Sequence, residues 1–199
     1  MTFLHPDLQL RFAVPAGFGM QNGATAVSIA GTNGQAQFSL APYSGDMTAY
    51  IDSVFKKIGG ETRIPYGEIR RTTVNGLPAA YSSATVNAQS GQVDVTVFAY
   101  EFARDRAYHF VALTQAGQMR SFDPLFASLR RMTEAEARAI RPRKIDIVTA
   151  GRGDTVASLS NRMAFSTYQA DRFRVLNGLG AGTEVRPAQK VKLVVYGSR

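Results

Sequence analysis

The sequence predicts an α+β protein in which an antiparallel sheet flanked by helices is followed by a small domain of β-α-α-β order. Three observations support this fold class. Apolar and polar residues alternate along most of the chain up to Thr114, which is typical of strands with one buried face. A strongly amphipathic helix pattern interrupts these strands at 47–58. Beyond Lys144, two strand patterns enclose two short helical patterns.

The strand patterns follow one another as antiparallel hairpins. A Gly-Thr-Asn-Gly turn at 31–34 carries the Asn-Gly pair that favours a tight hairpin. A further turn is expected at 89–91, between two long alternating segments. The segments that alternate are 8–14, 24–30, 35–41, 79–88, 92–102 and 107–114.

Helices are predicted at three places in the first domain. The pattern at 47–58 repeats apolar residues at three- and four-residue spacing, and Ser44 or Asp46 can cap its N-terminus. A second helix is expected at 118–129 and a short third one from Thr133, where a Thr-Glu-Ala-Glu start signal stands.

A basic stretch at 138–144, Arg-Ala-Ile-Arg-Pro-Arg-Lys, is the expected linker. It separates an α+β sandwich domain at 1–137 from the small domain at 145–199.

Composition excludes several kinds of site. The chain has 45% apolar residues, enough for a buried core, and no cysteine, so it has no disulfide and no thiolate metal site. Its formal charge of +8 favours anionic partners such as nucleic acid, acidic lipid or wall polymers, although a generic basic surface explains it equally well. No transmembrane segment is expected, and residues 1–10 lack the apolar core of a signal peptide, which suggests a mature fragment or expressed domain if the parent is exported.

Catalytic chemistry is not expected, because the usual motifs are absent. The two histidines, His5 and His109, lie far apart without HExxH, and no Gly-x-Ser-x-Gly or phosphate-binding loop is present. We expect His5 in a terminal loop and His109 on the surface or between strands. The sequence therefore predicts a chain that is not an enzyme, with no cofactor and no metal.

Several short sequence motifs of the second domain occur in a characteristic order. Val148 closes the first strand pattern, Gly-Asp-Thr-Val follows at 153–156, Leu-Asn-Gly-Leu stands at 176–179, and Pro-Ala-Gln-Lys-Val-Lys-Leu stands at 187–193. This order resembles the LysM domain, with Ala188 in place of the glycine that usually precedes the glutamine.

The LysM resemblance implies a shallow groove that binds polymers of N-acetylglucosamine, between the loop after the first strand and the loop before the last. Alternatively, Asp154 and Thr155 only cap one helix, and Asn177 and Gly178 only end the other. The groove residues that the resemblance implies are Gly153, Asp154, Thr155, Val156, Asn177, Gly178, Leu179 and Gly180.

The phrase His-Pro-Asp-Leu-Gln-Leu-Arg-Phe-Ala-Val-Pro-Ala-Gly-Phe at 5–18, together with the LysM-like tail, resembles the C-terminal region of exported HtpX-like zinc metallopeptidases, metallopeptidase family forty-eight. The resemblance implies a non-catalytic accessory region located in the periplasm or cell envelope, with peptidoglycan and the parent's peptidase domain as partners. The parent would be a zinc metalloprotease. The order of elements in the first domain is similar to PsbP-type α/β/α sandwiches.

Two other functions remain open. The chain could be a protein-interaction or regulatory domain without glycan binding, its groove covered by the first domain. It could also bind nucleic acid through charge, although no recognition motif accompanies the basic cluster, so this function is not favoured.

Overall fold

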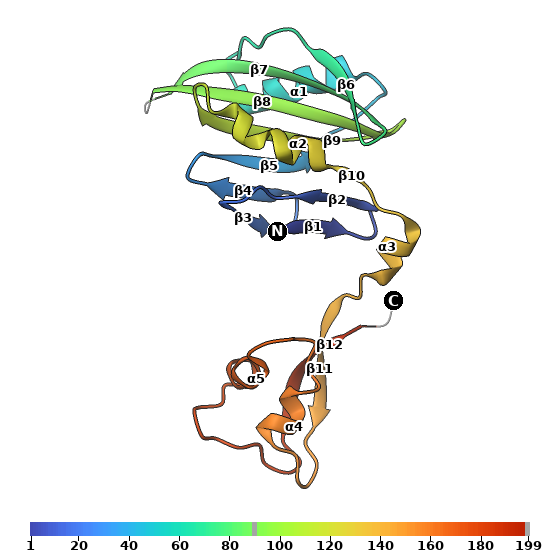
Figure 1. The fold of residues 1–199 in the computed structure, drawn as a ribbon, viewed down its shortest axis with the longest axis vertical. Helices are drawn as coiled ribbons and strands as arrows, with labels where there is room; N and C mark the ends of the chain where they lie inside the picture. The colour runs from blue at the N-terminus through green and yellow to red at the C-terminus, as the bar shows by residue number, and fades with distance from the viewer. Residues whose placement is uncertain (89–90, 198–199) are drawn as a thin grey trace. The chain divides into compact units, whose positions relative to one another are not determined.

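The computed structural model describes residues 1–88 and 91–197 (Figure 1). The chain divides into two compact units, Met1–Ala137 and Arg138–Arg199, each with its own core. Both contain antiparallel sheets and short helices, which confirms the predicted α+β class.

A large antiparallel sheet forms the centre of the first unit, with the strand order β3-β4-β5-β9-β8-β7-β6 over the described residues. The hairpin predicted at 31–34 joins β4 to β5, whereas the turn predicted at 89–91 includes residues 89–90, which lie outside the described residues. The strands are β3 (Phe18–Asn22), β4 (Val27–Gly31), β5 (Gly34–Leu40), β6 (Arg70–Val74), β7 (Leu77–Ala88), β8 (Gly91–Ala103) and β9 (Arg106–Gln115).

Helix α1 (Met47–Gly59) covers one face of this sheet. Of the two predicted caps, Asp46 is the one used: its carboxylate accepts hydrogen bonds from Thr48 N at 2.8 Å and Ala49 N at 3.3 Å. The apolar stripe of the helix, which includes the buried Ile51 and Phe55, packs on small and β-branched residues of β7 and β8.

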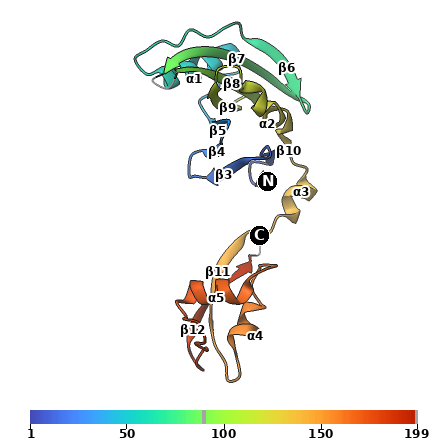
Figure 2. The same ribbon diagram turned by 60° about the vertical axis from the view of Figure 1, so that its left-hand side comes forward.

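The other face carries an aromatic core under a short helix and a small sheet, so α1 and α2 lie on opposite sides of the large sheet (Figure 2). Phe12, Phe38 and Phe110 meet there at ring-centroid distances of 4.9 to 5.1 Å. The covering elements are the 3-10 helix η1 (Met119–Phe122), α2 (Asp123–Ser128), and the small-sheet strands β1 (Thr2–His5), β2 (Leu10–Ala13) and β10 (Arg130–Arg131).

Strand β1 corrects the expectation that His5 lies in a terminal loop. His5 is the last residue of this strand and pairs with Leu10, and its Nδ1 lies 3.3 Å from Leu8 N. The strand pairs with β2, and its Phe3 stacks on Phe12. A pattern of only four residues is too short to be recognised as a strand in the sequence.

The second unit has the predicted β-α-α-β order: β11 (Arg143–Thr149), α4 (Val156–Ser160), α5 (Gln169–Asn177) and β12 (Lys190–Tyr196). It follows α3 (Glu134–Ala139), the helix predicted from Thr133. Strand β11 begins two residues earlier than expected, because Arg143 and Lys144 pair with β12, so these residues belong to the strand and not to the linker.

The core of the second unit lies between its two helices and one side of the β11–β12 sheet. It includes Leu159 and Phe173 from the helices and Val191 and Leu193 from β12. Across the described residues of both units, no helix is long and apolar enough to cross a membrane.

Candidate ligand groove of the second unit

Two loops of the second unit run side by side. The first loop (150–155) links β11 to α4, and the second loop (178–189) links α5 to β12. Ala150 N donates to Gln189 O at 2.9 Å, and Ala188 N donates to Ala150 O at 2.8 Å. These bonds extend the pairing of β11 and β12 into the loops and bring the two sides of the predicted groove together.

In the first loop, side chains of predicted groove residues hold the turn. The Asp154 carboxylate accepts from Gly151 N at 2.7 Å. Thr155 caps α4 in a capping box, in which its hydroxyl accepts from Ser158 N at 3.1 Å and the Ser158 hydroxyl accepts from Thr155 N at 3.0 Å. Gly153 has φ +87°, the left-handed backbone that favours glycine. The side chains of Asp154 and Thr155 are thus engaged inside the unit.

At the end of α5, immediately before the second loop, Asn177 binds the backbone of β12. Its Nδ2 donates to Lys192 O at 3.0 Å, and its Oδ1 accepts from Lys192 N at 2.7 Å. Gly178 ends α5 with φ +63°, Leu179 is half-buried against the core, and the carbonyl of Gly180 accepts from a neighbouring guanidinium. Asn177 therefore acts as a clamp between α5 and β12.

Glu184 joins the second loop to the start of α4, where the first loop ends, although sequence reasoning did not single it out. Its Oε2 accepts from Val156 N at 3.1 Å, at the start of α4. Its Oε1 lies 3.6 Å from the guanidinium of Arg174, which also donates to the carbonyls of Gly180 at 2.9 Å and Thr183 at 2.6 Å. Glu184 is the only acidic residue of the second loop and stands among small residues. This isolation is the sequence feature that could have identified it as a functional residue.

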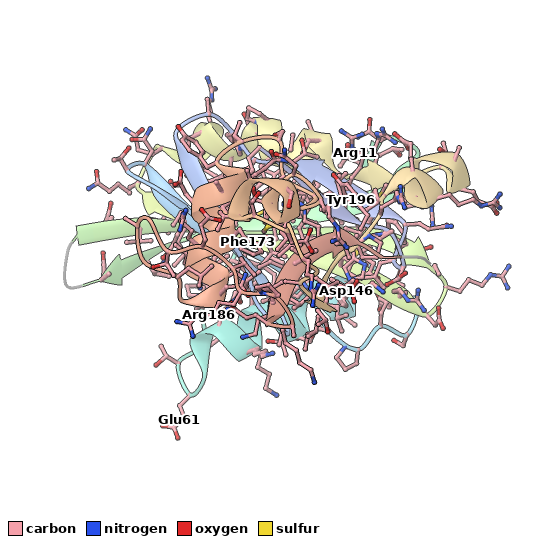
Figure 3. All side chains as sticks on the ribbon, turned by 90° about the horizontal axis from the view of Figure 1, so that it is seen from below. Arg11, Glu61, Asp146, Phe173, Arg186 and Tyr196 are labelled. Carbon is pink, nitrogen blue, oxygen red and sulfur yellow. The ribbon has the colours of Figure 1, made fainter. Side chains whose placement is uncertain are left out.

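A shallow hollow of about 440 Å³ lies over the second loop. Of the eight residues predicted for the groove, only Leu179 lines it, while Val156 is connected to it through Glu184. Arg186 lies at the surface of this unit and Phe173 in its interior (Figure 3). The residues that line the hollow are Leu179, Thr183, Glu184, Arg186, Pro187, Ala188 and Gln189.

The hollow offers neutral polar groups and apolar surface beside the charged Glu184 and Arg186. Thr183 offers a hydroxyl, and the Gln189 carbonyl oxygen accepts from Arg186 N at 3.0 Å, which leaves the amide NH₂ able to donate. Leu179 and Pro187 add apolar surface for a methyl group. A few polar groups around a small apolar surface are the usual composition of a ligand site.

The first unit buries a polar network around His109. His109 Nε2 lies 3.1 Å from Ser39 Oγ, and Nδ1 lies 2.8 Å from Tyr50 OH. The Tyr50 hydroxyl accepts from Ala41 N and lies 3.0 Å from Ala107 O. If this hydroxyl donates to Ala107 O, then His109 carries its proton on Nδ1 and accepts from Ser39, and every polar atom in the network is satisfied.

Burial, together with the positive charge of the nearby Lys57, lowers the pKa of His109 to about 4. Of the two positions expected for His109, on the surface or between strands, the structure shows the second: His109 lies between strands and is only 5% exposed. Among the described residues, no group of three or more histidine, cysteine or acidic side chains could hold a metal ion. The network thus joins β5, β9 and α1, and it contains no metal-ligand cluster.

Comparison with known proteins places the fold but not the activity. No protein-family model matches the sequence, and no curated protein matches it significantly. A crystal structure of a protein from Bacteroides thetaiotaomicron matches 100% of this chain and 87% of its own length, with a TM-score of 0.51 and 10% identity. A solution structure of PsbP (CyanoP) from Synechocystis matches 66% of this chain and 91% of its own, with a TM-score of 0.48 and 11% identity. At this level of identity, the Bacteroides thetaiotaomicron structure shares the fold alone with this chain.

Proposed function

We propose that this chain is a non-catalytic binding region in which a LysM-like second unit holds glycan that contains N-acetylglucosamine, such as peptidoglycan. The observation that carries the proposal is the joining of the second loop to the start of α4 by Glu184 beside a hollow of about 440 Å³. The β-α-α-β order of the unit and the LysM-like sequence motifs in its loops support this proposal.

Recognition would use the second loop more than the first. The Thr183 hydroxyl and the Gln189 amide would bind sugar hydroxyls and the acetamido carbonyl, while Leu179 and Pro187 would contact the acetamido methyl. Glu184 and Arg174 would hold the loop in shape before the ligand arrives, which lowers the entropic cost of binding.

The first unit would serve assembly. Its layers, with α1 on one face of the sheet and α2 with the small sheet on the other, agree with the α/β/α sandwich that we assign to the PsbP type. In this proposal the chain positions the peptidase domain of an HtpX-like zinc metallopeptidase at the cell wall, in the periplasm or cell envelope. An HExxH motif encoded upstream of Met1 would support this parent, and an unrelated upstream gene would count against it.

Sedimentation with insoluble peptidoglycan tests glycan binding. We expect the folded chain to be retained, and Thr183→Tyr, which fills the hollow, to lose about tenfold in apparent affinity, or about 1.4 kcal/mol. Thr167→Tyr is the matched control, because Thr167 is also exposed and does not line the hollow. Retention of the folded wild-type chain no greater than that of an unrelated basic protein would refute glycan binding.

A second candidate, a protein-interaction or regulatory region without glycan binding, is favoured by one observation. The side chains of Asp154, Thr155 and Asn177 all form hydrogen bonds within the unit. The LysM-like motifs that contain them can therefore be explained by a role in folding alone. Under this function the Thr183→Tyr and Thr167→Tyr variants would behave alike in the sedimentation.

A further inference from the structure

One side of the β11–β12 sheet faces away from the core of the second unit. Strand alternation and the observed register put Val148, Val191 and Leu193 on the core side. We call the opposite side the outer face. Its residues are Arg143, Ile145, Ile147, Thr149, Lys190, Lys192, Val194 and Tyr196.

The outer face exposes large apolar side chains from a regular strand. Ile145 is 59% exposed, Ile147 is 64% exposed, and Tyr196 is 49% exposed. Ile145 and Ile147 project from the same side of β11, and Tyr196 on β12 extends this apolar strip onto the second strand. Val194, which lies opposite Ile145, is half-buried and packs against the core. A contiguous strip of this kind, unlike single exposed apolar residues, marks an interaction surface.

Cations surround the apolar strip. Lys190 and Lys192 lie at one end and Arg143 at the other, all exposed, and none of the eight outer-face residues is acidic. Arg141 adds a further charge, with its guanidinium 5.4 Å from the centre of the Tyr196 ring. Within the described part of the chain, Arg143 and the two lysines form no ion pair. The guanidinium of Arg143 lies 4.8 Å from the centre of the Phe165 ring, so the two lysines are the cations that are available to a partner.

We propose that the outer face docks on the surface of an anionic lipid bilayer. Cations alone would suit any polyanion, including a hydrated wall polymer or nucleic acid. The exposed isoleucines disfavour these hydrated polymers, because Ile145 and Ile147 gain free energy only when they leave water, as they do in the apolar layer of a bilayer. Lys190 and Lys192 can extend apolar stems along the surface while their charged ends meet lipid phosphates, and Tyr196 suits the interfacial layer.

Vesicle co-sedimentation of the full chain tests this docking, with phosphatidylcholine vesicles and with vesicles that contain one quarter phosphatidylglycerol. We expect binding to the anionic vesicles only, and a loss of roughly tenfold or more for the double variant Ile145→Ser/Ile147→Ser and for Lys190→Gln/Lys192→Gln. Val175→Ser is the matched control, because Val175 is 84% exposed but lies on α5. It should bind vesicles like the wild type.

The same variants separate this inference from glycan binding. The isoleucine pair should leave peptidoglycan retention unchanged, and Thr183→Tyr should leave vesicle binding unchanged. Circular dichroism establishes that each variant is folded. The proposal is overturned if the wild type does not bind anionic vesicles. It is also overturned if the isoleucine variant binds them as well as the wild type, since charge alone would then account for the binding.

Discussion

At the scale of one residue, Ala188 occupies a backbone position that favours glycine. Its backbone has φ +67°, in the left-handed region that costs a residue with a Cβ about 1 kcal/mol or more. The conformation is imposed by its neighbours, because Ala188 N donates to Ala150 O and Gln189 returns toward β11. The departure seen in the sequence is therefore a small local strain beside the hollow.

Ala188→Gly should relieve this strain and raise the free energy of unfolding of the second unit by about 0.5 to 1 kcal/mol, after allowing for the greater freedom of glycine when unfolded. Urea unfolding would measure the change. Ala181→Gly is the control, since Ala181 lies in the same loop without a positive φ and should gain nothing. Equal effects of the two substitutions would contradict the strain.

His109 makes the stability of the first unit depend on pH. Its pKa is about 4 in the folded protein against 6.5 when unfolded, because burial disfavours the charged ring. Above pH 6.5 the ring is neutral in both states and its effect is constant. As the pH falls from 6.5 towards 4, the unfolded chain takes up a proton that the folded chain does not. The free energy of unfolding should then fall by about 3 kcal/mol.

Urea unfolding at a series of pH values would test this, with His109→Gln as the comparison. Glutamine can keep hydrogen bonds to Ser39 and Tyr50 without titrating, so the slope between pH 6.5 and 4 should largely disappear. Glu136, whose pKa is lowered to about 2 by Arg130, acts in a different window, below its ordinary pKa of 4.5. An unchanged slope in the glutamine variant would show that other groups cause it.

At the scale of elements, the second unit depends on links between segments that are far apart in sequence. Its sheet has only β11 and β12 within the described residues, and its helices are short. A two-stranded sheet is marginal without packing from helices. The paired hydrogen bonds from Asn177 to the backbone of Lys192 therefore connect α5 to β12 where the sheet alone would be weak.

Asn177→Ala should lower the free energy of unfolding of the second unit by about 2 kcal/mol, because it leaves two backbone groups of β12 without this partner. Thermal or urea unfolding would show it. Asn161→Ala is the control, since Asn161 ends α4 exposed and its side chain makes no hydrogen bond, and its effect should be within about 0.5 kcal/mol. A neutral Asn177→Ala would mean that the clamp is not required.

At the scale of the whole molecule, the chain consists of two units with separate cores. The first unit ends at Ala137, the residue at which the sequence placed the end of its first domain. Because the second unit buries its own core of residues such as Leu159, Phe173 and Leu193, we expect it to fold alone.

A fragment of residues 138–199 should therefore show a cooperative unfolding transition and the circular dichroism of a mixed α/β protein. It should also retain whatever peptidoglycan binding the full chain has. Non-cooperative melting of the fragment would show that its core is insufficient, a real hazard for a unit of this size.

The elements that could be predicted are those with long or strongly periodic patterns. The helix at Met47–Gly59, the hairpin between β4 and β5, and the β-α-α-β order were all recognisable, because local spacing and turn residues specify them. Strand β1 was missed because it has only four residues and depends on distant partners, the stacking of Phe3 on Phe12 and the pairing with β2.

The candidate site likewise has features that the sequence predicted and features that only the structure revealed. The sequence by itself determined that two loops with glycines at 153 and 178 flank the helices of the second unit, because left-handed turns and caps are local. Only the tertiary structure decided that Glu184 joins the second loop to the start of α4, that Asn177 serves β12, that His109 is buried, and that Ile145 and Ile147 face away from the core. The reason is that each of these outcomes depends on which distant segment packs alongside, and local patterns do not carry that information.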